Sequence, residues 1–326
     1  MTNQGALQGV RVADFGWVLA GPYATMLLGY MGAEVIKIES RRRPDEQRIA
    51  HRAGFSSELD ASSNFLEVNF NKKSVTLNLS TPEGAELARQ IVATSDVVVE
   101  NMRPGVMNRL GLGYPDLSAV KPDIIMVSIS GWGQSGPLRE YTAYAPCFAS
   151  FGGLAHLIGY ADGEPNTGTS AMDARSGTAA AFAALMALNI RQRTGQGQYI
   201  DLASGEALSC LVGDATMEYV LTGQSPARAG NRDTMMAPHN CYRCQGDDKW
   251  ISIAFMDTYG NLYDLPLDQR KMTRTTKESI FRMPGRFPPG DVDVNLCLWS
   301  DFDEVQNANE GAMYMTNFMR VGEYTY

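Results

Sequence analysis

Asp173 lies in the segment Thr167–Gly177, at the start of an alanine-rich stretch that predicts a long helix. A carboxylate there is stabilised by the free N–H groups of the first turn and by the helix dipole, so its simplest role is to cap the helix. A desolvated carboxylate can instead attack a thioester, while oriented N–H donors stabilise the oxyanion that forms. The residue types favour the cap, because no catalytic partner lies nearby in the sequence, and they leave the nucleophile open.

Three basic groups stand out in an otherwise acidic chain, and each lies next to a predicted strand. They are Arg41–Arg43 with Arg48, Lys72 with Lys73, and Arg103 with Arg109. Strand ends at one edge of an open sheet converge in space, so these groups could form a cationic pocket for a nucleotide or coenzyme A. For Arg41–Arg43 alone, solvated loop residues are the simpler interpretation. Arg103 is a stronger candidate, because it closely follows an apolar strand and loops on rigid strands often carry function.

The first predicted strand-to-helix turn spans Asp14–Ala24 and contains Gly21 and Pro22. A dinucleotide site would require the spacing G-x-G-x-x-G here, with backbone N–H groups directed at a pyrophosphate. That spacing is missing, and Pro22 lacks one of the N–H donors. The turn therefore disfavours a nicotinamide or flavin cofactor without excluding one.

Cys241 and Cys244 form a C-x-x-C pair, a spacing found in zinc and redox sites. No second pair lies nearby to complete a zinc tetrahedron, and the context does not match the strand-to-helix turn of thioredoxin. The five cysteines are too few and too irregular for a disulfide framework. We predict reduced thiols and no bound metal.

The composition limits the class of protein. With 326 residues, a net charge of −8 and 44% hydrophobic residues, the chain is typical of a globular protein of about two domains. A nucleic-acid partner is not expected, because binding to phosphates requires basic surface. No stretch reaches the roughly 18 apolar residues of a membrane span, and the start has no signal-peptide pattern. We expect a cytoplasmic protein with no membrane partner.

Short β-branched runs alternate with helical patterns in the first part of the chain. The predicted strands are 10–15, 35–39, 74–79, 97–100, 124–129 and 199–202. Most are apolar enough to be buried on both faces, which indicates a mainly parallel sheet with helices on both sides. The predicted fold class is therefore an open α/β sheet. Such sheets bind ligands beyond the carboxyl ends of their strands.

The helical patterns have recognisable ends. A serine, threonine, proline and glutamate at residues 80–83 predict the start of a helix over 82–94. Further helices are predicted at 25–30, 173–191 and 205–221. The pattern changes after residue 222, so we predict a large domain at 1–222 and a linker and small domain at 223–326. From about residue 256 the sequence indicates poorly specified structure.

Several segments form an ordered set of motifs. They are L-x-G-x-R-V-x-D-F with A-G-P at 7–22, G-A-E-V-I-K-I-E at 32–39, N-K-K-S-V-T-L-N-L at 71–79, V-E-N-M-R-P-G at 99–105 and a segment at 168–198 that ends in T-G-Q-G-Q. With A-G-N at 229–231 and K-W-I-S-I-A at 249–254, they resemble the class III CoA-transferases, the group of formyl-CoA transferase, carnitine CoA-transferase and α-methylacyl-CoA racemase.

The resemblance implies a Rossmann-like large domain, a second, smaller domain, and an interlocked homodimer or a heterodimer of two related subunits. It also implies an acyl-CoA:carboxylate CoA-transferase that uses acyl-CoA as a substrate and holds no tightly bound cofactor. In family members the aspartate that matches Asp173 attacks the acyl-CoA thioester to give a mixed anhydride, and it then carries CoA as an aspartyl thioester. The acceptor carboxylate finally takes over the acyl role and leaves with CoA.

By the same resemblance, a set of positions contacts CoA. These positions are Val18, Leu77, Asn101, Met102 and Arg109. Arg109 is suited to a phosphate group. Relatives carry an arginine where this chain has Ser40, and we predict that the neighbouring Arg41 substitutes for it.

Two departures from the family pattern leave alternatives open. Relatives usually have an acidic residue after the tyrosine that matches Tyr144, whereas this chain has Ala145. An acyl-CoA racemase or isomerase is therefore disfavoured, because that chemistry needs a second acid/base group opposite the first. Residues 256–326 do not match the small domain of relatives, which keeps open a non-catalytic partner subunit of a heterodimer. The sequence does not identify the acyl donor or acceptor.

Overall fold

The chain divides into two compact units. The large unit comprises Met1–Gly159 with Glu164–Ala227, and the small unit comprises Tyr160–Gly163 with Arg228–Tyr326. The computed structural model describes residues 5–49, 62–166, 169–232, 239–243, 248, 250–257, 292–298 and 317–320. The predicted division into functional domains at residue 222 stays a prediction.

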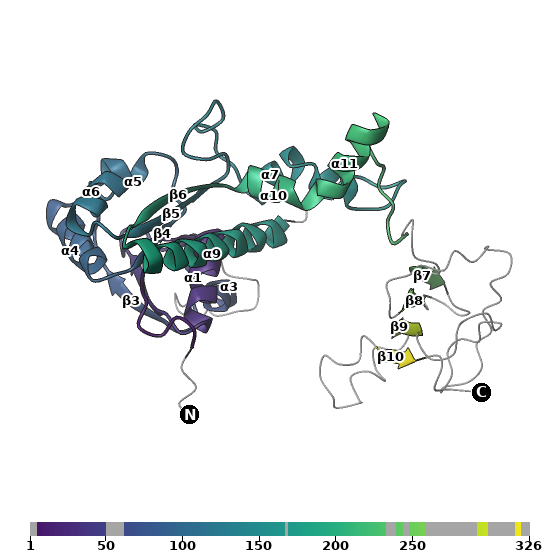
Figure 1. The fold of residues 1–326 in the computed structure, drawn as a ribbon, viewed down its shortest axis with the longest axis horizontal. Coiled ribbons are helices and arrows are strands. Elements are labelled where there is room, and N and C mark those ends of the chain that lie inside the picture. Colours follow the sequence, from purple (N-terminus) through teal and green to yellow (C-terminus); the bar gives the residue numbers. More distant parts are fainter. Residues whose placement is uncertain are drawn as a thin grey trace. The chain divides into compact units, whose positions relative to one another are not determined.

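The large unit is built on a six-stranded parallel sheet with the order β3-β2-β1-β4-β5-β6 (Figure 1). Its strands are β1 (Arg11–Asp14), β2 (Glu34–Glu39), β3 (Lys72–Thr76), β4 (Val97–Glu100), β5 (Ile125–Ser130) and β6 (Gln198–Ala203). The open α/β fold class and the presence of all six predicted strands are confirmed. The bounds of the third strand differ, because β3 begins at Lys72 and ends at Thr76 instead of spanning 74–79. The chain order reverses between β1 and β4, and folds of this type bind ligands beyond the carboxyl ends of the strands at such a switch point.

The strands form where β-branched residues can be buried on both sides of the sheet. All four residues of β4 are buried. Val12 of β1 pairs in register with Val35 of β2 and with Val97 of β4, so valines form a continuous row across the centre of the sheet.

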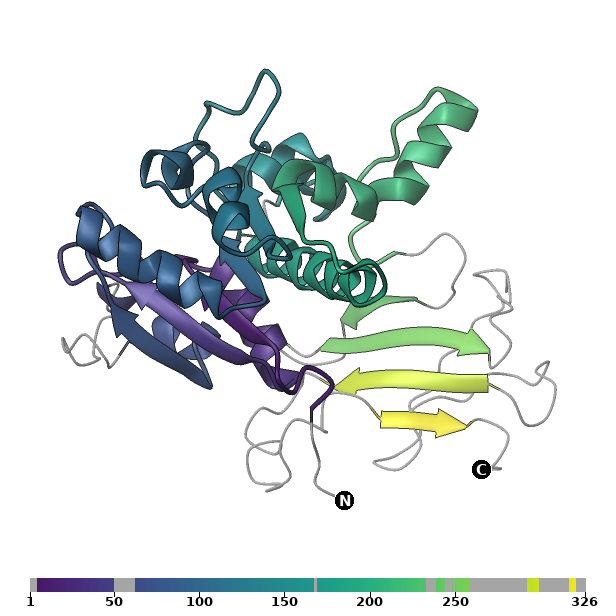
Figure 2. The ribbon, with the colours of Figure 1, turned by 60° about the vertical axis from the view of Figure 1, so that its left-hand side comes forward.

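Helices cover both faces of the sheet, and a second view shows the same layers (Figure 2). They include α1 (Ala20–Tyr30), α4 (Pro82–Ala93), α5 (Val106–Arg109), α6 (Tyr114–Val120) and α9 (Thr169–Thr194). On the first face, α1 and α9 contribute alanines to a core with Val97 and Val127. On the second face, α4, α5 and α6 surround Val98 and Met126.

The start of α4 confirms the predicted capping signal, whereas the start of α1 differs from the prediction. Thr81 Oγ1 accepts a hydrogen bond from the Gly84 N–H at 3.2 Å. The sequence predicts a turn at Gly21 and Pro22 before a helix, but α1 already begins at Ala20. Pro22 fits in the first helical turn because the N–H that it lacks has no intrahelical partner there.

Two later helices also differ from the prediction. The helix predicted at 173–191 is longer at both ends, because α9 runs from Thr169 to Thr194. The helix predicted at 205–221 is two helices, α10 (Ser204–Ser209) and α11 (Gly213–Thr222), joined by a 3₁₀ turn. Gly213, a residue of low helix propensity, lies at the junction.

A third core fixes the first turns of α9. The remaining helices of the large unit are α2 (Glu46–Ile49), α3 (Ser63–Val68), α7 (Ala145–Phe151) and α8 (Leu154–Leu157). Phe148, Leu154 and Leu208 form a buried cluster with Met172. Because Met172 directly precedes Asp173, this cluster sets the position of that carboxylate.

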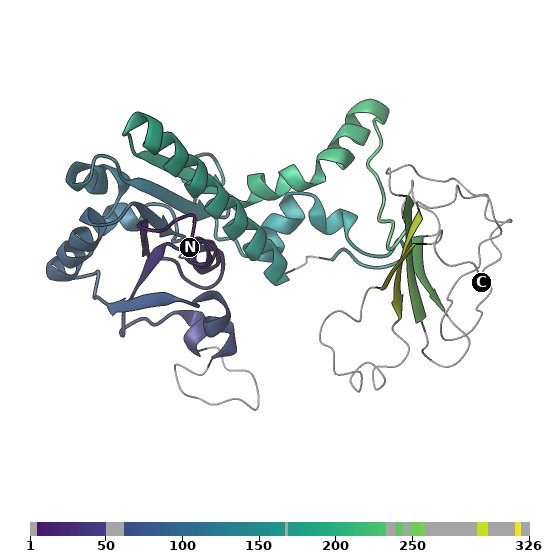
Figure 3. The same cartoon turned by 60° about the horizontal axis from the view of Figure 1, so that its bottom comes forward.

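The small unit contains a four-stranded antiparallel sheet with the order β10-β9-β8-β7 (Figure 3). Its strands are β7 (His239–Arg243), β8 (Trp250–Asp257), β9 (Val292–Leu298) and β10 (Asn317–Arg320). The expectation of poorly specified structure beyond residue 256 is wrong for β9 and β10. The alternating sequence V-D-V-N-L-C-L of β9 has the period of a strand, but polar and proline-rich neighbours mask this signal.

None of the helices within the described residues is long and apolar enough to cross a membrane. The cytoplasmic location stays a prediction.

Candidate functional site

Asp173 lies in the second turn of α9, because it is the fifth residue of a helix that begins at Thr169. A capping side chain serves the free N–H groups of the first turn, so the capping role favoured by the residue types is wrong. Asp173 is half-buried, and burial raises the pKa of its carboxyl group to about 6. Carboxyl groups with such a raised pKa are concentrated at functional sites.

The start of α9 lies at the carboxyl ends of the strands. Near this start, Gly177 packs so closely on α1 that an added Cβ atom would lie 2.6 Å from the Ala20 carbonyl oxygen. Near the other end, Arg191 forms a 2.8 Å ion pair with Asp96, the residue that precedes β4. Asp173 lies one helical turn before Gly177, so it belongs to the edge where α/β sheets bind ligands.

The turn between β1 and α1 is held by side chains from three different segments. Its successive backbone N–H groups donate hydrogen bonds as follows: Gly16 to Asp14 Oδ1 at 2.8 Å, Trp17 to Asn101 Oδ1 at 2.7 Å and Val18 to Asp45 Oδ1 at 3.1 Å. A pyrophosphate bound at a Rossmann turn needs such donors to be free. The geometry therefore supports the sequence argument against a nicotinamide or flavin site at this turn.

Val18 has an unusual backbone conformation. Its φ of 62° lies in the left-handed region, which β-branched residues rarely adopt. Strained residues persist only where their surroundings hold them, and they cluster at binding and catalytic sites. This observation supports the predicted binding role of Val18.

Arg41 lies in the exposed segment that follows β2, together with Arg42 and Arg43. The Arg43 guanidinium lies 5.0 Å from the centre of the Trp17 ring, in a cation–π contact. The contact places the arginine segment beside the turn that contains Val18, so these two predicted binding elements lie at the same edge.

The other predicted binding residues follow β3 and β4. The Leu77 N–H donates to the Glu39 carbonyl oxygen at 2.8 Å, and the Met102 N–H donates to Glu100 Oε2 at 2.7 Å. Leu77 and Met102 are half-buried, and Arg109 is exposed at the end of α5. The six predicted binding residues therefore follow the carboxyl ends of β1 to β4, which a parallel sheet brings to one edge.

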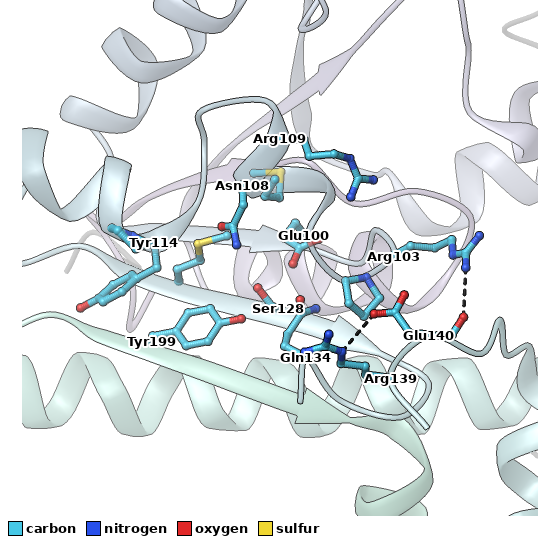
Figure 4. Close-up of a pocket in the computed structure, with 15 residues that line it drawn as sticks. Glu100, Arg103, Asn108, Arg109, Tyr114, Ser128, Gln134, Arg139, Glu140 and Tyr199 are labelled. Atoms are coloured by element: carbon cyan, nitrogen blue, oxygen red, sulfur yellow. Dashed lines mark hydrogen bonds and ion pairs between the residues drawn. The ribbon is translucent and has the colours of Figure 1, made fainter. Parts of the chain in front are cut away.

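A cavity of about 490 Å³ lies on the second face of the sheet at the carboxyl end of β4 (Figure 4). Figure 4 shows Glu100, Ser128 and the hydroxyl group of Tyr199 directed toward the same space. The residues that line it also include Arg103, Arg109 and Arg139. Its volume is in the range of small-molecule sites.

Ser128 and Tyr199 are not among the site residues predicted from the sequence. Glu100 pairs in register with Ser128 of β5, and Ser128 pairs with Asp201 of β6, so the three residues form a row across the sheet. The alternating pattern I-M-V-S-I-S of β5 could have indicated a polar face. The row itself depends on register, which the sequence does not show.

Glu100 is a buried acid within this cavity. Burial raises its pKa to about 7, and repulsion from Asp201 acts in the same direction. Hydrogen bonds from the Ser128 hydroxyl group and the Met102 N–H oppose the rise. Glu100 therefore changes its charge near neutral pH.

Lys72 and Lys73 do not belong to the predicted cationic pocket. They begin β3 rather than follow its carboxyl end. Lys72 Nζ forms a buried ion pair with Asp14 at 3.0 Å, and Lys73 pairs with Glu34. Burial lowers the pKa of Lys72 to about 8, although Asp14 opposes this shift. The Lys72 ammonium group is thus neutralised inside the protein, where it also donates to the Pro22 carbonyl oxygen at 2.8 Å. Lys73 pairs with the first residue of β2, at the opposite end of that strand from the predicted pocket.

Neither an acid at position 145 nor a metal cluster is present in the part of the chain that the structure describes. Ala145 begins α7 and is buried. Among the described residues, no group of three or more His, Cys, Asp and Glu side chains could hold a metal ion. Cys241 is a free thiol, and Cys244 lies outside the described residues.

Comparisons with known proteins agree with the motifs. The family model of CoA-transferase family III matches residues 7–260. The chain is 38% identical over 248 residues to a succinyl-CoA–D-citramalate CoA-transferase of Chloroflexus aurantiacus, with 76% of this chain and 61% of the relative covered. It is 38% identical over 250 residues to the alpha subunit of a succinyl-CoA–L-malate CoA-transferase of Chloroflexus aurantiacus, with 76% and 58% covered.

A solved structure of similar fold is a CAIB/BAIF family protein from Brucella suis. Its TM-score is 0.72 at 34% sequence identity, with 78% of this chain and 67% of that chain covered. The chain spans about three-fifths of the length of the two curated relatives.

Proposed function

The chain belongs to CoA-transferase family III, and from this premise we propose that it is an acyl-CoA:carboxylate CoA-transferase with Asp173 as its nucleophile. The observation that carries the proposal is the setting of Asp173. Its carboxyl group is half-buried at the ligand-binding edge of the sheet, has a pKa raised to about 6 and does not cap α9. At pH 7 this group is mostly ionised and partly desolvated, as a nucleophilic carboxylate must be.

The first half of the reaction loads CoA onto the enzyme. The Asp173 carboxylate attacks the thioester carbonyl of the acyl-CoA, and the carbon–sulfur bond breaks to give an acyl–aspartyl anhydride and CoA thiolate. The thiolate then attacks the aspartyl carbonyl carbon, which forms an aspartyl-CoA thioester and releases the donor carboxylate. Covalent catalysis replaces one difficult exchange by steps of similar energy.

The second half reverses these steps with the acceptor. The acceptor carboxylate attacks the aspartyl thioester and expels CoA thiolate, and this thiolate then attacks the acceptor carbonyl of the new anhydride. The products are acceptor acyl-CoA and the free carboxylate of Asp173. The sequence of steps consumes no water and needs no metal or redox cofactor.

For the CoA moiety, we assign the edge residues Val18, Arg41, Leu77, Asn101, Met102 and Arg109, as the family resemblance implies. Arg41 and Arg109 are exposed guanidinium groups suited to the phosphates. The side-chain amide of Asn101 accepts the Trp17 N–H and donates to the Trp17 carbonyl oxygen. Asn101 therefore contributes to CoA binding by holding the β1–α1 turn in place.

The alternatives are less well supported. Ala145 is buried and supplies no second acid for a racemase or isomerase. A non-catalytic partner subunit would not require the raised pKa of Asp173. The retention of a partly desolvated carboxyl group at the binding edge therefore favours the transferase.

We further propose that the active protein is an interlocked dimer, with a second copy or a related subunit. None of the residues of α11 is buried, and the helix exposes Met217, Tyr219, Val220 and Leu221. Apolar side chains grouped in this way mark interaction surfaces. Of the two Chloroflexus aurantiacus relatives, one is named as an alpha subunit and the other carries no subunit name, so both assemblies remain candidates.

The proposal is tested by trapping the intermediate. The protein is incubated with succinyl-CoA and a panel of other acyl-CoAs, treated with hydroxylamine or borohydride, and digested for peptide mass spectrometry. We expect the adduct on the peptide that contains Asp173, and its loss in Asp173→Asn. Asp162→Asn, at an exposed position of the small unit, is the matched control and keeps the adduct.

The other outcomes identify the alternatives. Normal CoA binding without an adduct from any donor would support the partner subunit. Exchange of deuterium into the acyl α-carbon without transfer would support racemisation.

A further inference from the structure

Asp45 is a buried carboxylate that lies between two elements of the proposed CoA-binding edge. It is fully buried, although it follows the exposed arginines Arg41–Arg43. Its oxygens accept the Val18 N–H at 3.1 and 3.2 Å, and Oδ1 also accepts the Gln47 N–H at 3.0 Å. One side chain thus joins the segment after β2 to the turn after β1.

The charge of Asp45 is balanced inside the protein. Lys37 Nζ lies 3.4 Å from Asp45 Oδ2, and both side chains are almost completely buried. The same ammonium group donates to the Gly16 carbonyl oxygen at 2.8 Å. The ion pair therefore holds the β1–α1 turn through two hydrogen bonds. Lys37 donates to the Gly16 carbonyl oxygen, and Asp45 accepts from the Val18 N–H.

The backbone conformation of Val18 must be stabilised by its surroundings. A β-branched residue at a φ of 62° is strained, and the conformation persists only when neighbouring groups hold it. Asn101 fixes the preceding residue, Trp17, by its N–H and its carbonyl oxygen. Asp45 is the side chain that fixes the N–H of Val18 itself.

We propose that Asp45 is a positioning residue for CoA: its carboxylate holds Val18 in the left-handed conformation and anchors the arginine segment 41–43 beside it. This inference rests on the proposed CoA-binding role of Val18 and Arg41. The Asp45 carboxylate is enclosed by Lys37 and by the N–H groups of Val18 and Gln47, so it is not free to contact the reacting groups. It acts on CoA affinity rather than on the chemical step.

The test compares two variants without the buried charges. In Lys37→Met/Asp45→Asn, the amide oxygen can still accept the Val18 N–H, whereas Lys37→Met/Asp45→Ala has no acceptor. Removing both partners of a buried ion pair avoids leaving an unpaired charge. Affinity for coenzyme A is measured by calorimetry on the full chain, and stability by urea unfolding. Glu46→Gln, an exposed neighbour, is the control.

We expect the alanine variant to bind coenzyme A about tenfold more weakly than the asparagine variant, which keeps the hydrogen bond. The rate of the Asp173 adduct at saturating acyl-CoA stays within about twofold in both, because the chemical step is untouched. Equal affinity of the two variants, alongside normal binding by the wild type, overturns the inference alone. Absence of coenzyme A binding in the wild type overturns the proposed function and the inference with it.

If the alanine variant does not fold, a further variant tests whether Asp45 acts by holding Val18. Glycine adopts positive φ without strain, so adding Val18→Gly removes the need for a hydrogen bond from residue 45 to hold this conformation. We expect this triple variant to unfold at a urea concentration close to that of the asparagine variant. No recovery of folding would show that Asp45 does not act through Val18, and would overturn the inference.

Discussion

Asn101 and Trp17 are joined by two hydrogen bonds that cross the switch point of the sheet. Asn101 Oδ1 accepts the Trp17 N–H at 2.7 Å, and Asn101 Nδ2 donates to the Trp17 carbonyl oxygen at 2.8 Å. The two bonds fasten the turn after β4 to the turn after β1. Gly21 lies so close to this amide that an added Cβ atom would approach Asn101 Oδ1 to 2.8 Å. At the edge proposed to bind CoA, the turns after β1 and β4 are thus held together by close backbone and side-chain contacts.

Asn101→Asp should weaken the connection between these two turns, because it removes one of the two hydrogen bonds. The carboxylate can still accept the Trp17 N–H, but its second oxygen faces the Trp17 carbonyl oxygen and cannot donate. We expect a loss of about 2 kcal/mol in the free energy of unfolding, measured with urea, and a several-fold rise in KM for the acyl-CoA. A variant with unchanged stability and KM would show that the second hydrogen bond contributes nothing.

The rate of adduct formation on Asp173 should follow the ionisation of its carboxyl group. Burial raises the pKa to about 6, and only the deprotonated form attacks the thioester. Below pH 6 the single-turnover rate should rise about tenfold per pH unit, and it should level off above about pH 7. A rate that is already constant from pH 4.5 would mean that the carboxyl group has an ordinary pKa.

The strands of the large unit could be predicted because their signal is local. A run such as Val97–Val99 must be buried wherever it lies, and a threonine and proline such as Thr81 and Pro82 start a helix by their own chemistry. For the same reason, the residues at strand ends could be expected to meet at one edge.

What could not be predicted depends on contacts between distant segments. The row from Glu100 to Asp201 exists only through the register of three strands. Asp45 has no special pattern in its own segment, and its importance follows from Lys37 and Val18. Helices α1 and α9 each begin about one turn earlier than predicted, because tertiary packing overrides the local signals there.

Glu100→Gln should change how stability depends on pH. The ordinary pKa of the group is 4.5, and the folded protein raises it to about 7. Between these values the folded state keeps a proton that the unfolded state has lost, so the free energy of unfolding falls as pH rises from about 4.5 to 7, by at most about 3 kcal/mol. Glutamine stays neutral and can still accept the Met102 N–H.

The measurement is urea unfolding of both proteins at pH 5 and pH 8. At pH 8 we expect Glu100→Gln to be more stable than the wild type, and its stability to differ less between the two pH values. Glu46→Gln removes an exposed carboxylate and should retain the wild-type dependence. The same dependence in Glu100→Gln and the wild type would contradict the prediction.

Gly177→Ala should separate the helix that carries Asp173 from α1. The added Cβ atom would lie 2.6 Å from the Ala20 carbonyl oxygen and 3.1 Å from the Ala24 nitrogen, both backbone atoms that cannot move independently. Overpacking of this kind costs about 1–3 kcal/mol of the free energy of unfolding, and displacement of α9 should also slow formation of the Asp173 adduct.

Gly213→Ala is the matched control. Gly213 begins α11, and a Cβ atom there meets nothing within 4 Å, so alanine should raise stability by about 0.5–1 kcal/mol through its higher helix propensity. Equal effects of the two substitutions on urea unfolding and adduct rate would show that the contact between α9 and α1 does not set the position of Asp173.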